Sequence, residues 1–141
     1  MATKILFVCV GNTCRSQMAE GFARRYGQGS VEVRSAGTSA AGYVNRSTIE
    51  AMNEVGIDIS GQASTQVTDE LIEWADVVVT MGCCPAAELC PKGCSAKKYD
   101  WKIEDPLGRP WEVMRRVRDE IEKKVRELIL AEGEPVQDPR R

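Results

Sequence analysis

A cysteine and an arginine lie six positions apart near the N-terminus, in a segment that reads Cys9-Val-Gly-Asn-Thr-Cys-Arg15-Ser16. A cysteine acts as a nucleophile when its thiolate is stabilised, and an arginine can hold two oxygens of a tetrahedral anion. Gly11 and Asn12 tolerate the left-handed backbone angles of a tight loop, and such a loop can turn several N–H groups inward around an anion. The segment therefore predicts an oxyanion-binding loop with Cys9 as the nucleophile.

The features that would bind the anion also act on Cys9. Inward N–H groups, the positive end of a following helix and Arg15 favour the thiolate, and the Ser16 hydroxyl can donate a hydrogen bond to it. An alternative interpretation is a buried core cysteine beside a surface arginine, and packing is the simplest use for Cys14. On the functional interpretation, the anion is bound by the loop residues Gly11, Asn12, Thr13, Cys14, Arg15 and Ser16.

Four further cysteines lie close together in the second half of the chain. The whole sequence contains no histidine. Without histidine, papain-like and serine-hydrolase mechanisms are excluded, so cysteine chemistry must depend on arginine, backbone dipoles and carboxylates. A relay of thiols, a structural zinc site and inert cysteines are the three interpretations. An adjacent pair is poor geometry for one tetrahedral ion, and a neat Cys-x2-Cys knuckle is missing, which disfavours zinc. These cysteines are Cys83, Cys84, Cys90 and Cys94.

The pattern of apolar residues predicts strands that alternate with helices. Such an order is typical of an α/β protein: a single domain with a four-stranded parallel sheet and helices on both faces. Ligands of these sheets bind beyond the carboxyl ends of the strands, and the first strand ends at Cys9. The expected strands are 5–10, 31–35, 77–80 and 97–101, and the expected helices are 16–26, 46–55, 68–74 and a long one from Pro110 to about Leu128.

Composition sets broad limits on the protein. Hydrophobic residues make up 43% and charged residues 28% of 141 residues, which suits one globular domain, here 1–131, followed by a disordered tail, 132–141. The formal net charge of −2 does not indicate a nucleic-acid or membrane surface. The N-terminal apolar run is too short to span a membrane and does not resemble a secretory signal, so we expect a cytoplasmic protein.

The loop and the helix after it, Cys9-Val-Gly-Asn-Thr-Cys-Arg-Ser-Gln-Met-Ala-Glu-Gly, resemble those of the thioredoxin-coupled arsenate reductases. That family has the fold of the low-molecular-weight protein tyrosine phosphatases. Phosphatases usually carry proline after the Arg-Ser of the loop and aromatic residues after Asp-Pro, whereas this chain has Gln17 and Leu107-Gly108. Reductases also carry a cysteine pair after the third strand, for which Cys83 and Cys90 are the candidates here. All of these differences favour the reductase. Further similar segments are Ser35-Ala-Gly-Thr38, Glu54-Val-Gly-Ile-Asp-Ile-Ser60, Asp76-Val-Val-Val-Thr80 and Glu104-Asp-Pro106, within a likeness from Lys4 to Leu130.

The resemblance implies roles for three residues outside the loop. Asp105 corresponds to the acid that protonates the leaving oxygen, although an Asp-Pro pair is more often a solvated carboxylate beside a helix. Cys83 and Cys90 have the spacing of the reductases' redox pair, and Cys84 is an alternative to Cys83 as the first relay thiol. The implied reaction is reduction of arsenate to arsenite, with phosphate or sulfate as competing anions and thioredoxin as external reductant.

The resemblance also bears on cofactors and on alternatives. No tightly bound cofactor and no metal are expected, and the protein is expected to be a monomer. Asn12, Glu20 and Ser35 resemble residues that hold a monovalent cation in some relatives, but Thr65 stands where those relatives carry an acid. The alternatives are a tyrosine phosphatase acting through a phosphocysteine and a non-catalytic module that binds an oxyanion or zinc.

Overall fold

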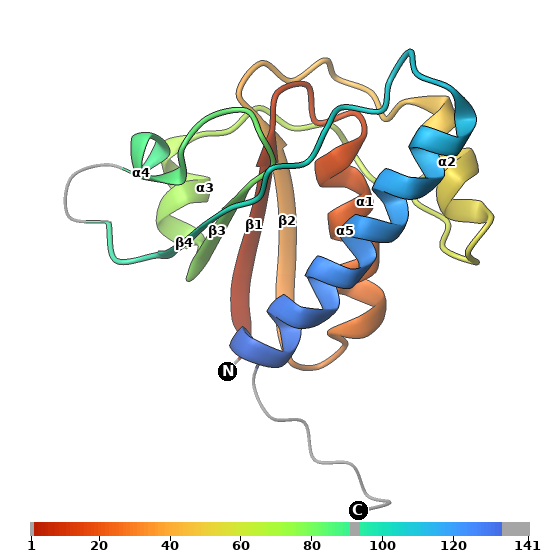
Figure 1. The fold of residues 1–141 in the computed structure, drawn as a ribbon. Coiled ribbons are helices and arrows are strands. Elements are labelled where there is room, and N and C mark those ends of the chain that lie inside the picture. The colour runs from red at the N-terminus through yellow and green to blue at the C-terminus, as the bar shows by residue number, and fades with distance from the viewer. Residues whose placement is uncertain (1, 91–93, 134–141) are drawn as a thin grey trace, which may run out of the picture.

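Four parallel strands form one sheet in the order β2-β1-β3-β4. The computed structural model describes residues 2–90 and 94–133 and is drawn in Figure 1. The strands are β1 (Thr3–Cys9), β2 (Val31–Gly37), β3 (Val77–Thr80) and β4 (Lys97–Asp100). The central strands β1 and β3 are almost fully buried, as expected of a parallel sheet covered on both faces. The predicted α/β fold is confirmed.

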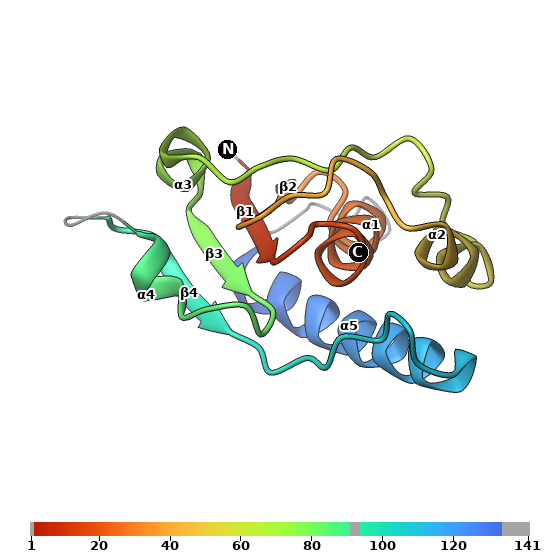
Figure 2. The same ribbon diagram turned by 90° about the horizontal axis from the view of Figure 1, so that it is seen from above.

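Helices cover both faces of the sheet (Figures 1 and 2). The helices α1 (Arg15–Tyr26), α2 (Arg46–Asn53) and α5 (Trp111–Glu132) contribute buried residues to one core, and α1 packs against α5. The shorter helices α3 (Asp69–Trp74) and α4 (Ala86–Leu89) pack on the other face. The sequence pattern did not predict α4, which has only four residues.

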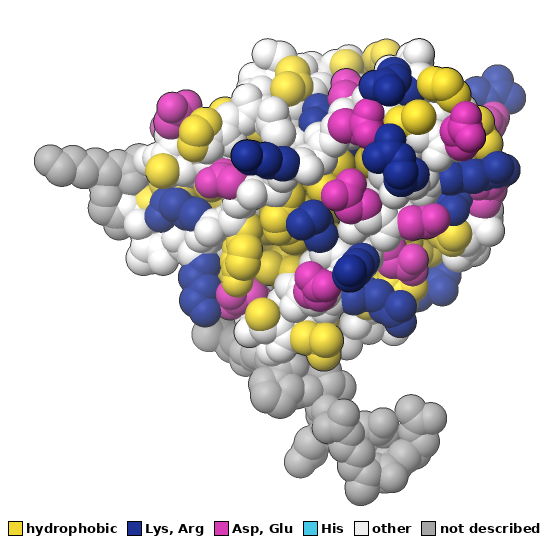
Figure 3. Space-filling model, in the orientation of Figure 1, with side chains coloured by type: hydrophobic (Ala, Val, Ile, Leu, Met, Phe, Trp, Pro, Cys, Tyr) yellow, Lys and Arg dark blue, Asp and Glu magenta, His cyan; other side chains and the backbone are white. Residues whose placement is uncertain are grey.

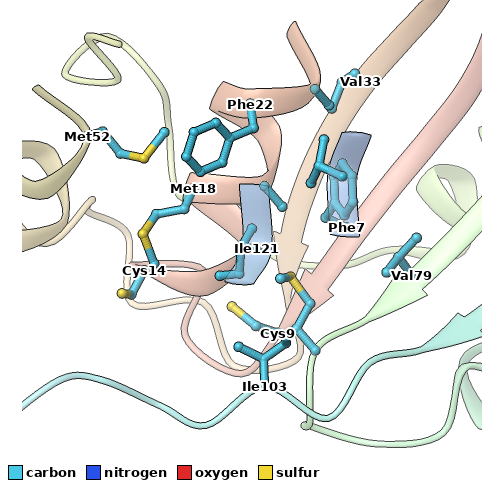
Figure 4. Close-up of a cluster of buried hydrophobic side chains, with 14 of the residues drawn as sticks. Phe7, Cys9, Cys14, Met18, Phe22, Val33, Met52, Val79, Ile103 and Ile121 are labelled. Carbon is cyan, nitrogen blue, oxygen red and sulfur yellow. The ribbon is translucent and has the colours of Figure 1, made fainter. Parts of the chain in front are cut away.

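Successive side chains of β1 point to opposite faces of the sheet, as strand geometry requires. Ile5, Phe7 and Cys9 belong to the core beneath α1 and α5, whereas Leu6 and Val8 belong to the smaller core beneath α3 and α4. Figure 4 shows the larger core, with Cys9 at its edge. The nucleophile candidate therefore lies on the α1 side of the sheet, at the carboxyl end of a central strand.

Several element boundaries differ by a few residues from the sequence expectation, for local reasons. Thr68 precedes α3 as its N-cap, since its side chain accepts a hydrogen bond from the Leu71 N–H. Pro110 is the N-cap of α5 but makes no side-chain capping bond. The helix α5 continues to Glu132, one residue into the range expected as a tail, and 134–141 lie outside the described residues.

Ion pairs connect α2 to α5 across the surface. The Glu54 carboxylate at the end of α2 lies 2.7 Å from both Arg115 and Arg118, and the hydrogen bond from Arg115 lowers the pKa of Glu54 to about 2. Figure 3 shows acidic and basic side chains interspersed over this face.

Within residues 2–90 and 94–133, no helix combines the length and apolar character needed to cross a bilayer.

Candidate active site

The loop between β1 and α1 turns sharply at Asn12. Asn12 has φ 52°, and it is the only non-glycine residue with a positive φ in the part of the chain that the structure describes. Its side-chain oxygen accepts a hydrogen bond of 2.8 Å from the Thr65 N–H, which fixes the turn from a neighbouring segment. Of the two loop residues that tolerate a left-handed angle, Gly11 and Asn12, it is Asn12 that adopts one.

The Cys9 sulfur accepts hydrogen bonds within the loop. The Asn12 N–H donates to Sγ at 3.2 Å, and the Ser16 hydroxyl lies 2.8 Å from Sγ. Because Asn12 Nδ2 donates to Ser16 Oγ at 2.7 Å, the Ser16 proton is free to point at the sulfur. Both groups then donate to Cys9, which favours a thiolate at this position. Cys9 is only 2% exposed, so its sulfur is well shielded from bulk solvent.

The backbone of the loop presents donors that no described residue uses. The N–H groups of residue 11 and of residues 13–16 donate to no acceptor within 2–90 and 94–133. Cys14 is the N-cap of α1 but makes no side-chain capping bond, and the first turn of the helix carries no acidic residue. The positive end of α1 is therefore uncompensated by side chains, which is the arrangement that binds anions at helix N-termini.

A cavity of about 340 Å³ lies in front of these donors. Cys9 and Arg15, from the loop, and Asp105, from the segment before α5, all line this cavity. Asn12 and Ser16 are fully buried behind the loop and orient Cys9 rather than face the cavity. The complete lining is Cys9, Val10, Gly11, Thr13, Cys14, Arg15, Ala41, Tyr43, Asp105 and Leu107.

Arg15 is anchored on one side and free on the other. Its Nη1 donates to the backbone carbonyls of Met81 and Ile103 at 2.6 and 2.9 Å. These bonds hold the guanidinium plane in place while its remaining N–H groups stay available to an anion. Gly82 makes this approach feasible, because a Cβ there would lie 3.1 Å from Nη1, and its φ of +95° suits glycine alone.

Asp105 is exposed at the rim of the cavity, before the buried Pro106. One of its carboxylate oxygens accepts a hydrogen bond of 3.0 Å from the Leu107 N–H, which orients the side chain. The neighbouring Glu104 is instead paired with Arg109 and Arg116 on the surface. Of the two carboxylates, only Asp105 lines the cavity and can give a proton to a bound oxyanion.

Cys14 contributes its side chain to the core. Its sulfur lies 4.0 Å from the Met114 sulfur, and burial raises the pKa of the Cys14 thiol to about 12. The packing role expected for this side chain is consistent with that position. Cys14 therefore stays protonated beside Cys9 and does not compete with it as a thiolate.

The four later cysteines form two pairs around α4. The sulfurs of Cys83 and Cys84 lie 3.1 Å apart, and Cys83 donates to the Val8 carbonyl at 3.7 Å. A hydrogen bond joins Cys90 to Cys94. Burial raises the pKa of Cys90 to about 11, whereas the hydrogen bond from Cys90 lowers the pKa of Cys94. None of the six cysteines forms a disulfide. Across the described residues, no group of three or more metal-ligating side chains converges on one point.

Two supporting residues were not assigned roles from the sequence. The fully buried Gln17 donates to the carbonyls of Asn12 and Ala63, at 2.9 and 3.0 Å, and so braces the loop from behind. Proline, usual at this position in the related phosphatases, has no such donor. Gly37 ends β2 so close to the loop that a Cβ would lie 2.4 Å from the Val10 carbonyl. The sequence marked Gln17 only as a departure from the proline of the phosphatases.

The residues that resemble a monovalent-cation site lie together behind the loop. Ser35 donates to Glu20 at 2.6 Å, and Asn12 Nδ2 donates to Ser35 at 3.0 Å. Arg24 donates to the other Glu20 oxygen at 2.7 Å, so an arginine already neutralises this carboxylate. Thr65 contributes a backbone N–H there rather than an acid.

Comparison with known proteins places this site in a family. Residues 4–138 match the model of the low molecular weight phosphotyrosine protein phosphatases. An arsenate reductase of Halalkalibacterium halodurans is 46% identical over 129 residues, which cover 86% of this chain and 91% of that protein.

Solved structures give the same assignment. The structure of an arsenate reductase in the phosphate binding state has a TM-score of 0.83 and 40% identity, over 92% of this chain and 98% of that one. A thioredoxin-dependent arsenate reductase of Corynebacterium glutamicum has a TM-score of 0.78 and 33% identity, over 92% of this chain and 61% of that one. The chain thus belongs to the low molecular weight phosphotyrosine protein phosphatase family, in its arsenate reductase branch.

Proposed function

We propose that this protein reduces arsenate to arsenite through a relay of three thiols and that thioredoxin restores the reduced enzyme. The observation that carries the proposal is the position of Cys83: its sulfur contacts the carbonyl of Val8, the residue before the nucleophile Cys9. A phosphatase needs no second thiol at this place. The similarity to arsenate reductases, one of them thioredoxin-dependent, supports the same function.

Arsenate binds in the 340 Å³ cavity. The unused N–H groups of residue 11 and residues 13–16 surround its oxygens, and Arg15 adds its free N–H groups. The solved relative in a phosphate-binding state supports a tetrahedral anion in this place. Phosphate and sulfate share that shape and negative charge and compete for the site.

The first step forms a bond from Cys9 to arsenic. The Cys9 thiolate attacks arsenic, an As–O bond breaks, and Asp105 protonates the departing oxygen so that it leaves as water. Asn12 and Ser16 hold the sulfur in position with hydrogen bonds until it reacts. Arg15 and the N–H groups stabilise the charge that the oxygens carry during the displacement.

The next two steps move electrons from protein thiols to arsenic. The Cys83 thiolate attacks the Cys9 sulfur, the electron pair of the S–As bond passes to arsenic, and arsenite leaves. Cys90 then attacks Cys83, which releases Cys9 as a thiolate and leaves an 83–90 disulfide. The dithiol of thioredoxin reduces this disulfide by exchange, so no bound cofactor takes part.

The contacts support Cys83 rather than Cys84 as the first relay thiol. Both thiols line the cavity beside β4, but within the described residues only Cys83 has a hydrogen bond to the end of β1. Burial and the neighbouring Cys83 raise the pKa of Cys84 to about 12, which makes Cys84 the poorer nucleophile at neutral pH. Cys83, Cys90 and Cys94 pack against the same small core.

Arg15→Lys should lower kcat/KM for arsenate by about 100-fold or more, the loss that follows removal of a charge-stabilising donor. A lysine ammonium cannot hold both carbonyl acceptors of Arg15 and also present a planar pair of donors to the anion. Steady-state kinetics with arsenate and titration with inorganic phosphate measure the effect. A mild loss would mean that the backbone N–H groups hold the anion without Arg15.

Replacing potassium by sodium at constant ionic strength should leave kcat/KM for arsenate almost unchanged. Arg24 already pairs with Glu20, and Thr65 offers no carboxylate to a cation. The measurement is arsenate turnover in matched chloride salts. Activation of several-fold by potassium alone would show that a cation binds beside Glu20 in spite of Arg24.

Coupled turnover tests the function itself. The protein, thioredoxin, thioredoxin reductase and NADPH should oxidise NADPH when arsenate is added, and a phosphoaryl substrate should be hydrolysed far more slowly. Some hydrolysis is expected, because phosphate and arsenate share shape and charge. Rapid hydrolysis without arsenate-dependent oxidation of NADPH would identify a phosphatase instead. We further propose that the enzyme acts as a cytoplasmic monomer.

A further inference from the structure

The paired sulfurs of Cys83 and Cys84 form a feature that the relay does not explain. Their separation is 3.1 Å, and both side chains are partly exposed. They line a cavity of about 350 Å³ beside β4, which differs from the cavity of Cys9. The relay uses only one of the two thiols. Two reduced sulfurs that face one cavity can chelate a thiophilic centre.

The spacing of the two sulfurs selects the kind of centre. Across 3.1 Å, two bonds of about 2.3 Å, the usual zinc–thiolate length, would meet at about 85°, far from the tetrahedral angle of about 109°. Trivalent arsenic is pyramidal, because it carries a lone pair, and its bonds stand much closer to right angles. The pair therefore suits trivalent arsenic better than a tetrahedral metal ion.

The surrounding structure holds the pair in place before anything binds. Pro85 follows Cys84 with a fixed φ of −67°, and the next residue, Ala86, donates its N–H to Asp100 at 2.8 Å. The same carboxylate oxygen accepts a hydrogen bond of 2.5 Å from Thr80 at the end of β3. The segment carrying the two thiols is thus tied to the sheet, so little ordering is lost when a ligand is chelated.

We propose that Cys83 and Cys84 form a dithiol site that chelates trivalent arsenic, the oxidation state of the proposed product. Arsenous acid, As(OH)3, reacts with the two thiols: two S–As bonds form, two As–O bonds break, and the two thiol protons leave in two water molecules. Arsenic keeps its third hydroxyl and its oxidation state, so no oxidant or reductant is needed. Binding of added arsenite does not rest on the proposed function, because arsenate takes no part.

Titration of the reduced protein with sodium arsenite, followed by calorimetry without oxygen, tests the site. The wild type should bind one equivalent. Cys84→Ser should bind about 100-fold more weakly, because the second bond of a chelate gains an effective concentration that a single thiol lacks. Cys94→Ser is the matched control, since it also removes one thiol of a pair, and it should bind like the wild type.

Three results would overturn the site: no binding by the wild type, unchanged binding by Cys84→Ser, or loss of binding in Cys94→Ser. Retained phosphate binding by each variant shows that the fold and the Cys9 loop are intact. Trp101 lines the same cavity, so a change in tryptophan fluorescence on arsenite binding that Trp101→Phe removes locates the arsenic independently. A fluorescence change that persists in Trp101→Phe would place the arsenic elsewhere and would contradict the proposal.

Discussion

Cys9→Ser should abolish both arsenate reduction and hydrolysis of an aryl phosphate, with a loss of at least about 10⁴-fold, as for other enzymes that lose their nucleophile. A serine hydroxyl forms no comparable anion at neutral pH, and the hydrogen bonds from Asn12 and Ser16 would then meet a neutral oxygen. Steady-state rates with both substrates measure the loss.

Phosphate binding is the control for this variant. The N–H groups of the loop and Arg15 remain, so Cys9→Ser should still bind inorganic phosphate by calorimetry. Substantial turnover by a variant that binds phosphate would remove Cys9 from the mechanism.

Cys90→Ser should separate the two chemistries of the family. It should keep hydrolysis of a small aryl phosphate, because that reaction needs only Cys9, Arg15 and Asp105 and water completes the cycle. It should lose repeated arsenate reduction, because Cys90 supplies the second sulfur of the disulfide that thioredoxin reduces. The enzyme should stop after at most one turnover with Cys9 and Cys83 joined, which mass spectrometry of the arsenate-treated variant can show.

The neighbouring thiol is the control for that experiment. The hydrogen bond from Cys90 lowers the pKa of Cys94, so Cys94 is the thiol best placed to substitute for Cys90. If Cys90→Ser reduces arsenate normally, adding Cys94→Ser decides between a substitute thiol and a failed relay. A trapped bond from Cys9 to Cys84 would keep the relay but would show that Cys83 is the wrong middle thiol.

The fold and the centre of the site could be predicted because their signals are local. Apolar β-branched runs mark the buried strands, and the strand–loop–helix order places Cys9 at the carboxyl end of the sheet. Gly11 and Asn12 both tolerate a left-handed turn, and the turn forms at Asn12, whose side chain accepts a hydrogen bond from the Thr65 N–H. That contact joins residues 53 positions apart, so the loop sequence alone could not reveal it.

The supports of the site depend on contacts between distant segments. Arg15 is held by carbonyls 66 and 88 residues further along the chain, and backbone acceptors leave no mark in a sequence. The helix α4 has too few residues for a periodic pattern and owes its position to the Asp100 carboxylate. The resemblance to arsenate reductases supplied the candidate partners Cys83 and Cys90, and the structure then added the contact of Cys83 with β1.

Mapping the disulfide formed by arsenate alone is the most direct test of the central claim. The reduced wild type is treated with arsenate in the absence of thioredoxin, its remaining thiols are alkylated in acid, and its peptides are identified by mass spectrometry. One arsenite should be released per chain, and a disulfide should join Cys83 to Cys90, with Cys9 alkylated. Release of arsenite with a different disulfide, or six alkylated cysteines after exposure to arsenate, would contradict the central claim.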